Sequence, residues 1–169
     1  MLAMIFMILP RAGVSAKRIN EVLDRKITIK DGKLKGDKTT DIGTVEFRNV
    51  SFKYPDADEY LLKDISFKAN KGDTIAFIGS TGSGKSTLIN LVPRFYDATE
   101  GEVLVDGINV KDYELRHLYN KIGYIPQKAV MFNGTVASNV AYGDNGKGTK
   151  SKEKIKEAVS VAQGKEFVE

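Results

Sequence analysis

Residues 79–87 have the types and the spacing of a loop that binds phosphate. They fit the pattern G-x-x-x-x-G-K-[ST] at every fixed position. Glycines let the backbone fold closely around an anion, so that several N–H groups point at it. Lys85 would place an ammonium on the terminal phosphates, and the Ser86 hydroxyl can ligate Mg²⁺. We therefore predict that nine consecutive residues form the binding loop: Gly79, Ser80, Thr81, Gly82, Ser83, Gly84, Lys85, Ser86 and Thr87.

The segments on either side of this loop have patterns that would position it. Residues 74–78 are apolar and rich in β-formers, which predicts a buried parallel strand. Residues 87–92 are apolar at helical spacing, and Pro93 ends that helix. A strand, a glycine loop and a helix in this order form the context that supports the motif.

The residues before the loop predict two strands. Val45 and Phe47 alternate with polar residues, and the alternation resumes in a shifted phase at Val50, so we expect one strand with a bulge near Asn49. A second strand is expected at residues 61–69. The other expected elements are strands at 102–105 and 122–125, helices at 112–120, 135–140 and 151–163, turns at 55–58, 70–73 and 106–107, and a polar loop at 144–150.

The first nine residues are all apolar, a stretch too short to span a membrane alone. No Lys or Arg precedes it, which argues against a signal peptide. A helical stripe of apolar residues continues to Leu23, and Arg11, Lys17 and Arg18 follow the apolar stretch as a cytoplasmic flank would. We therefore expect residues 1–28 to be the end of a transmembrane helix with its cytoplasmic extension. The polar residues 29–42 are expected to form a linker.

Composition limits the class of protein. With 169 residues, 41% of them hydrophobic, the chain suits one globular domain. It contains no cysteine, which excludes disulfides and cysteine metal sites and suits a reducing cytosol. The net charge of +4 comes from scattered lysines without interleaved stacking aromatics, so we expect no nucleic-acid partner.

Three further residues are candidates for chemistry, and the residues alone leave their roles open. Tyr54 is either a core or edge aromatic or a ring on which a purine stacks. Gln127 follows Pro126 at the end of an expected buried strand, where ligand sites of parallel sheets lie; its amide either reaches Mg²⁺ and the attacking water or belongs to a plain polar loop. Asp106 stands where a Mg²⁺-binding acid could end a strand, but Gly107 after it favours a turn.

Together these segments resemble the nucleotide-binding domain of an ABC transporter, of the exporter type in which membrane and ATPase domains are fused. The similarity covers nearly the whole chain and is most specific in residues 43–143. It is carried by the phosphate loop and by six further segments: V-S-F-K-Y-P from Val50, P-R-F-Y-D from Pro93, G-E-V-L-V-D-G from Gly101, I-G-Y-I-P-Q from Ile122, F-N-G-T-V from Phe132 and N-V-A-Y-G from Asn139.

The resemblance implies an α/β fold, namely the P-loop NTPase core of an ABC nucleotide-binding domain, with a mixed sheet and an antiparallel β subdomain in residues 43–169. It implies that Tyr54 stacks on the adenine of ATP and that the loop, with Lys85, binds the phosphates. Ser86 and Gln127 would then contact Mg²⁺. Gln127 would also serve catalysis and link the nucleotide site to the membrane domain.

The resemblance also implies partners and a location. ATP would bind between two such domains, as a homodimer or a heterodimer, on the cytoplasmic side of the cell membrane. The segment from Ala129 to Phe132 falls where the family touches the coupling helix of the membrane domain. Asp106 matches a structural turn of the family and not its metal-binding acid.

The second half of the chain departs from the family. The sequence contains no Gly-Gly pair and hence no L-S-G-G-Q signature. No apolar strand ending in Asp-Glu follows Gln127, and no histidine follows it, so the family's Mg²⁺-binding acid, catalytic base and switch histidine are missing. We therefore expect a fragment with an incomplete fold, inactive as an ATPase on its own.

Two alternatives are weighed against this interpretation. An unrelated P-loop enzyme, such as a GTPase or a small-molecule kinase, needs a base-reading motif or an arginine-bearing lid. Neither is found, because Gly123 replaces the acid in the only N-K-x-D-like stretch, which starts at Asn120. A non-catalytic nucleotide-binding or interaction module is the second alternative, and the missing motifs favour it for the chain as printed.

Overall fold

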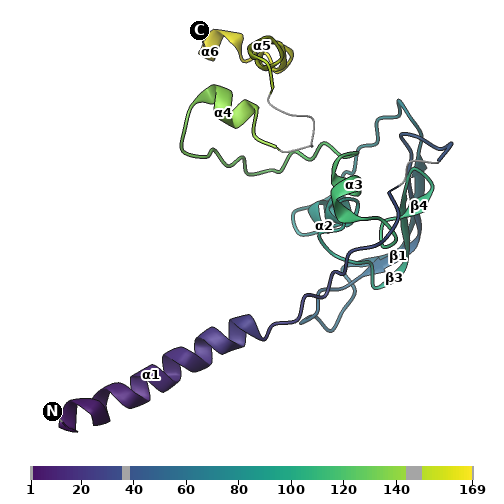
Figure 1. Cartoon of the computed structure of the whole chain (residues 1–169). Helices are drawn as coiled ribbons and strands as arrows, with labels where there is room; N and C mark the ends of the chain where they lie inside the picture. Colours follow the sequence, from purple (N-terminus) through teal and green to yellow (C-terminus); the bar gives the residue numbers. More distant parts are fainter. Residues whose placement is uncertain (1, 36–38, 144–149, 169) are drawn as a thin grey trace. The chain divides into compact units, whose positions relative to one another are not determined.

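The structure, a computed structural model, describes residues 2–35, 39–143 and 150–168. It divides into two compact units, Met1–Leu115 and Arg116–Glu169, which are described separately below. Figure 1 shows their elements. The phosphate loop lies in the first unit and Gln127 in the second.

The first unit is built on a four-stranded antiparallel sheet with the strand order β2-β1-β3-β4. Its strands are β1 (Val45–Phe52), β2 (Leu62–Ala69), β3 (Glu100–Val105) and β4 (Ile108–Asn109). The strands expected from alternating apolar residues are confirmed here. β4 has only two residues, too short for alternation to indicate it, and it pairs with β3 across the expected turn at residues 106–107.

The bulge expected in β1 is confirmed at Asn49. Phe47 pairs with Phe67 of β2, but Val50 pairs with Ile65, so the register shifts between them. Asn49 itself has φ 48°. Because the extra residue restores the phase, Phe47 and Val50 are both buried.

Gly101 of β3 lies directly against this bulge. A Cβ there would lie 2.3 Å from the Asn49 carbonyl oxygen and 2.4 Å from that of Arg48. Gly101 also has φ 76°, a left-handed conformation that favours glycine. The bulge and the glycine therefore depend on each other.

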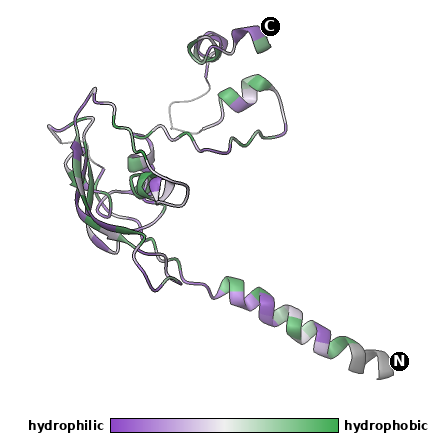
Figure 2. Cartoon of the chain, turned by 180° about the vertical axis from the view of Figure 1, so that it is seen from behind, coloured by the Kyte–Doolittle hydropathy of each residue, from purple (hydrophilic) through white to green (hydrophobic). Residues whose placement is uncertain are grey.

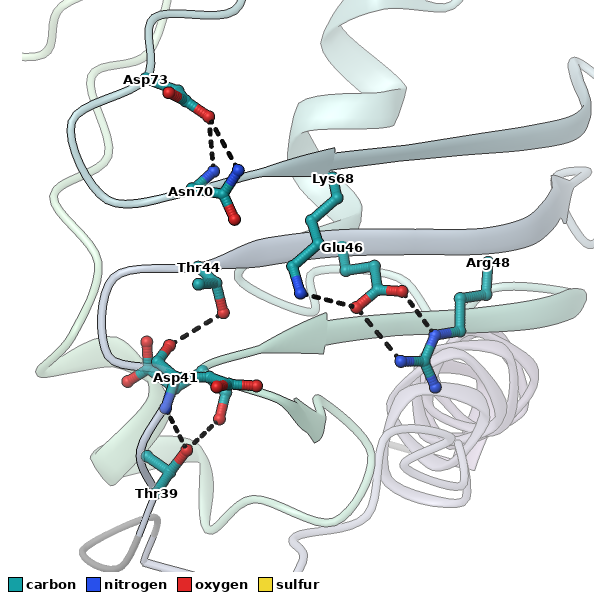
Figure 3. A network of polar contacts seen from close by, with 9 residues as sticks. Thr39, Asp41, Thr44, Glu46, Arg48, Lys68, Asn70 and Asp73 are labelled. Atoms are coloured by element: carbon teal, nitrogen blue, oxygen red, sulfur yellow. Dashed lines mark hydrogen bonds and ion pairs between the residues drawn. The ribbon is translucent and has the colours of Figure 1, made fainter.

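The outer face of the sheet carries a polar network (Figure 3). The carboxylate of Glu46 accepts a hydrogen bond from Arg48 Nε at 2.7 Å and lies 3.9 Å from Nζ of Lys68, its cross-strand partner. The hydrogen bond from Arg48 lowers the pKa of Glu46. At one end of the sheet, Asp73 Oδ2 accepts from the backbone N–H of Asn70 at 2.7 Å, which closes the expected turn at residues 70–73.

The core of the first unit lies between the sheet and helix α2 (Lys85–Leu91), which lies on one side of the sheet (Figure 1). Leu88 and Leu91 of α2 are buried, and Val92 caps its C-terminal end. The expected helix at residues 87–92 is therefore confirmed, starting two residues earlier. The buried apolar side chains of the sheet include Phe47, Val50, Phe52, Leu62, Val103, Leu104 and Val105.

Helix α1 (Leu2–Leu23) begins the chain and contains Pro10. From Ile8 onward its residues are exposed. Figure 2 shows hydrophobic and hydrophilic patches alternating along this part of the helix. Among the helices of the described residues, none combines the length and the apolar character that a membrane crossing needs.

Two predicted strands are wrong as secondary structure. Residues 74–78 and 122–125 form no strand, and Ile78 and Ile125 are 96% and 94% exposed. An apolar run of β-formers becomes a strand only where neighbouring strands accept its backbone hydrogen bonds. Within the described residues neither segment pairs with another strand. The sheet of the described residues is therefore antiparallel rather than mixed.

Helix α3 (Leu115–Tyr119) is shorter than the helix expected at residues 112–120. The segment before it pairs with residues 32–34 instead. The backbone N–H of Gly32 donates to Tyr113 O at 2.9 Å, and Glu114 N–H donates to Leu34 O at 2.8 Å. These bonds engage backbone groups that a longer helix would use, and the Asp31 carboxylate accepts from Leu115 N–H at 2.6 Å where the helix begins.

The described residues of the second unit form three further helices, α4 (Val136–Val140), α5 (Lys152–Val161) and α6 (Lys165–Val168), joined by irregular segments. The helices expected at residues 135–140 and 151–163 are confirmed as α4 and α5. Thr135 and Ser138 form a capping box at α4, and the Ser151 hydroxyl accepts from Lys154 N–H at α5. Most of the expected polar loop at residues 144–150 lies outside the described residues.

Candidate functional site

Two glycines give the phosphate loop its shape. Gly82 has φ 84° and Gly84 has φ 89°, both left-handed. A Cβ on Gly84 would also lie 2.8 Å from Cδ2 of Leu62 in β2. Gly84 therefore lets the loop turn into α2 while the helix start stays close to the sheet.

Lys85 points back into its own loop. Its Nζ donates to the carbonyl oxygens of Gly79 at 2.8 Å and Ser80 at 2.6 Å, and to the Ser83 hydroxyl at 3.3 Å. These three partners match the three donors of an ammonium. The loop is thereby curled around a positive charge, which is what an anion-binding loop requires.

The exposure of the loop differs sharply between its last two residues. Residues 79–83 and Ser86 are exposed, so their hydroxyl and backbone groups are accessible to a ligand. Thr87, the next residue, is only 6% exposed. Within the described residues, no group of three or more His, Cys, Asp or Glu side chains is placed to hold a metal ion. Mg²⁺ bound with a nucleotide takes few protein ligands besides the phosphates, and the exposed Ser86 hydroxyl could supply one.

Tyr54, just after β1, meets the first turn of α2. Its hydroxyl shares a hydrogen bond with the Thr87 hydroxyl, with 2.9 Å between the oxygens. Its ring stands nearly perpendicular to the rings of Phe52 and Tyr96, at centroid distances of 5.0 Å and 5.4 Å. The side chain is 36% exposed, so part of it is open to a ligand. The structure thus brings two sequence-predicted site residues together across 33 positions of the chain.

Sequence reasoning missed Tyr96 and the contact of Tyr54 with Thr87. The aromatic residues Phe95 and Tyr96, shortly after the helix, could have indicated a second aromatic ring near Tyr54. No pattern in the sequence indicated the hydroxyl contact, because it joins distant segments.

Asp106 is a structural residue. It is 4% exposed with φ 53°, and its carboxylate accepts from the backbone N–H of Gly43 at 2.7 Å. Its carbonyl oxygen accepts from the Thr39 hydroxyl. The neighbouring Tyr113 is fully buried and donates to Val105 O at 3.0 Å; burial, reinforced by the Asp106 charge, raises the pKa of Tyr113 to about 12.

The second unit places Gln127 in an exposed bend after Pro126. Val130 and Met131 beyond it are 66% and 70% exposed. Phe132, which follows Met131, is held by the side chain of Asn139. This side chain accepts from Phe132 N–H at 2.7 Å and donates to Phe132 O at 3.0 Å. The apolar segment from Ala129 to Phe132 is therefore presented to solvent from a backbone that α4 fixes.

Comparison with known proteins agrees with these features. Residues 62–168 match the ABC transporter family. The chain is 43% identical over 159 residues to the ATP-dependent lipid A-core flippase of Pseudomonas aeruginosa, which covers 94% of this chain and 26% of that protein. It is 42% identical over 166 residues to multidrug resistance protein 1 of Entamoeba histolytica, covering 95% of this chain and 13% of that protein.

A solved structure of a bacterial Atm1-family ABC exporter with ATP bound is similar to the chain with a TM-score of 0.77 and 30% identity. It covers 99% of this chain and 29% of that one. The chain thus spans about a quarter of the length of the flippase and the exporter that it matches. The fold is that of an ABC nucleotide-binding domain, a P-loop NTPase fold with mixed α/β content and an antiparallel sheet. The chain therefore belongs to the ABC transporter family.

Proposed function

We propose that this chain binds ATP as part of the nucleotide-binding domain of an ABC exporter. The observation that carries the proposal is the meeting of Tyr54 with the helix that leaves the phosphate loop, at 2.9 Å between the Tyr54 and Thr87 hydroxyls. This contact joins the partly exposed ring of Tyr54 to the helix that begins at the loop, and the same loop surrounds the Lys85 ammonium. Adenine stacks on the ring, and the phosphates take the loop N–H groups and Lys85.

Three residues have further roles in the proposed site. Lys85 gives up its hydrogen bonds to the loop carbonyls and donates to the terminal phosphates instead. These new hydrogen bonds are strong because both the donor and the acceptor are charged. Ser86 would hold Mg²⁺ through its hydroxyl, and the bound ion would supply positive charge to neutralise the phosphates. Gln127 would contact the metal and the attacking water, as the family resemblance implies, and would serve turnover more than affinity.

The proposed activity is ATP binding and hydrolysis coupled to transmembrane export. Two nucleotide-binding domains, identical or different, close around ATP on the cytoplasmic side of the membrane and reopen after hydrolysis, which is a ligand-driven population shift. The exposed segment from Ala129 to Phe132 docks the coupling helix of the membrane domain. In this scheme residues 1–28 end a transmembrane helix, residues 29–42 link it, and residues 43–169 belong to the nucleotide-binding domain.

Membership of the ABC family removes the alternative of an unrelated P-loop enzyme. For the 169 residues alone we propose nucleotide binding without turnover, because the sequence after Gln127 contains neither an apolar strand that ends in Asp-Glu nor a histidine. We expect this chain to release phosphate from ATP no faster than its Lys85→Ala variant does. Release above that control would contradict it.

The test of ATP binding is a calorimetric titration of the protein at its natural length. Lys85→Ala removes the ammonium and is expected to abolish ATP binding. Lys71→Ala makes the same charge change in the exposed turn at residues 70–73 and should leave the affinity unchanged. An unchanged affinity in Lys85→Ala would overturn the proposed function.

A further inference from the structure

The side chain of Asn139 spends its whole amide group on backbone atoms of the loop before α4. Its Oδ1 accepts from Phe132 N–H at 2.7 Å, and its Nδ2 donates to Phe132 O at 3.0 Å and to Thr135 O at 2.9 Å. A neutral amide offers one oxygen acceptor and two N–H donors. The three hydrogen bonds therefore use the oxygen and both donors, a combination that an aspartate or a leucine of the same size does not offer.

The apolar segment that ends at Phe132 is not held in place by burial. Val130, Met131 and Phe132 are 66%, 70% and 50% exposed. A segment that buries so little apolar surface is ordered only where hydrogen bonds or ring contacts restrain it. Phe132 has both restraints. Asn139 holds its backbone, and its ring stacks on that of Tyr142, with the centroids 4.2 Å apart and the planes at 23°. The segment is therefore tied at Phe132 to α4 and to the residues that follow this helix.

We propose that Asn139 is a positioning residue that holds the segment from Ala129 to Phe132 in the form that docks the coupling helix of the membrane domain. This inference rests on the proposed function, which gives the segment that partner. Fixing an exposed apolar segment before its partner arrives lowers the entropy cost of docking. The proposed nucleotide contacts, at Tyr54 and the phosphate loop, lie in the first unit and do not involve Asn139. Asn139 therefore governs how the ATP-binding domain engages the membrane domain and not how tightly ATP binds.

The experiment measures how well the membrane domain covers this segment in the protein at its natural length, reconstituted in lipid nanodiscs. Val130→Cys introduces a thiol into the segment, in a protein freed of any other cysteine, and a water-soluble maleimide labels the thiol slowly while the segment is docked. Adding Asn139→Ala is expected to speed the labelling at least about fivefold. It removes three hydrogen bonds, each of which shifts a local opening equilibrium roughly two- to tenfold. The ATP affinity, measured by calorimetry, should stay unchanged.

Two further variants make the comparison specific. Asn133→Ala removes the same amide from an exposed asparagine of the same loop, so it should change neither the labelling rate nor the ATP affinity. Asn139→Asp keeps an oxygen that accepts from Phe132 N–H but loses both donors, so it should also speed the labelling. A role of Asn139 in folding alone would lower the melting temperature and the ATP affinity together, whereas a positioning role changes the labelling rate and leaves the ATP affinity as it was.

Three results would overturn the positioning role. Labelling could stay as slow with Asn139→Ala as without it, it could rise equally with Asn133→Ala, or the ATP affinity could fall in parallel with the faster labelling. Should Asn139→Ala not fold, Asn139→Asp decides by the same criteria. Failure of the proposed docking differs from all three. The Val130→Cys thiol would then be labelled, with Asn139 intact, as fast as the thiol of Lys71→Cys, which lies in an exposed turn.

Discussion

The ammonium nitrogen of Lys85 lies 2.6 Å from the carbonyl oxygen of Ser80 and 2.8 Å from that of Gly79. The side chain that is proposed to bind phosphate thus also closes the loop on itself. A cation that bridges several backbone carbonyls restrains the chain that carries them.

Removing this bridge should loosen the loop even without nucleotide. In Lys85→Met, we expect the amides of residues 79–84 to exchange hydrogen roughly two- to tenfold faster, because the bonds that a charged donor makes to the loop are lost. The measurement is hydrogen exchange followed by mass spectrometry, with β1 peptides as the internal control. Equal exchange in the loop of both proteins would show that Lys85 does not restrain it.

The bulge of β1 should tolerate no side chain at Gly101. Gly101→Ala combines φ 76° with a Cβ 2.3 Å from a backbone oxygen, whereas Gly72→Ala has φ 93° but nothing within 4 Å. Gly72→Ala should therefore cost about 1–2 kcal/mol of unfolding free energy, the left-handed penalty alone. Gly101→Ala should cost clearly more, because backbone cannot move aside as a flexible side chain can. Denaturant unfolding of the two variants checks this, and equal losses would mean that the bulge adapts.

The buried Tyr113 should make stability fall at high pH. Its pKa of about 12 in the folded protein exceeds the ordinary value of 10.0. Below pH 10 both states keep the proton. Between pH 10 and 12 the unfolded state loses it and the folded state does not, so the free energy of unfolding falls by up to about 1.4 kcal/mol per pH unit.

Tyr113→Phe is the matched variant for this test. It loses the hydrogen bond to Val105 and cannot titrate, while every other titratable group of the chain is unchanged. The stability advantage of the unaltered protein over Tyr113→Phe should shrink as pH rises from 9 to 11.5 in urea titrations. A constant difference would mean that the folded pKa is ordinary.

The sequence predicts well what depends on near neighbours. Helix α2 and the bulge at Asn49 follow from apolar residues at helical spacing and from a shift in apolar alternation, and both are present. The helices expected at residues 135–140 and 151–163 are also present, because each begins with a local contact: a hydroxyl, of Thr135 or Ser151, accepts from a backbone N–H three residues on.

What depends on distant partners is predicted less well. Residues 74–78 and 122–125 carry strand-like apolar runs, but a strand exists only where another strand pairs with it. The start of α3 depends on residues 32–34, far earlier in the chain. The contact between Tyr54 and Thr87 joins segments 33 positions apart, so neither residue's surroundings indicate it.

The central claim is that adenine lies on Tyr54 while its phosphates occupy the loop. Photoaffinity labelling with 8-azido-ATP tests this most directly, with the modified peptides identified by mass spectrometry. The account predicts a label on the peptide that holds Tyr54 or on the one that holds Tyr96. This label should disappear with excess ATP and in Lys85→Ala. A label that ATP displaces but that falls on neither peptide would contradict the account.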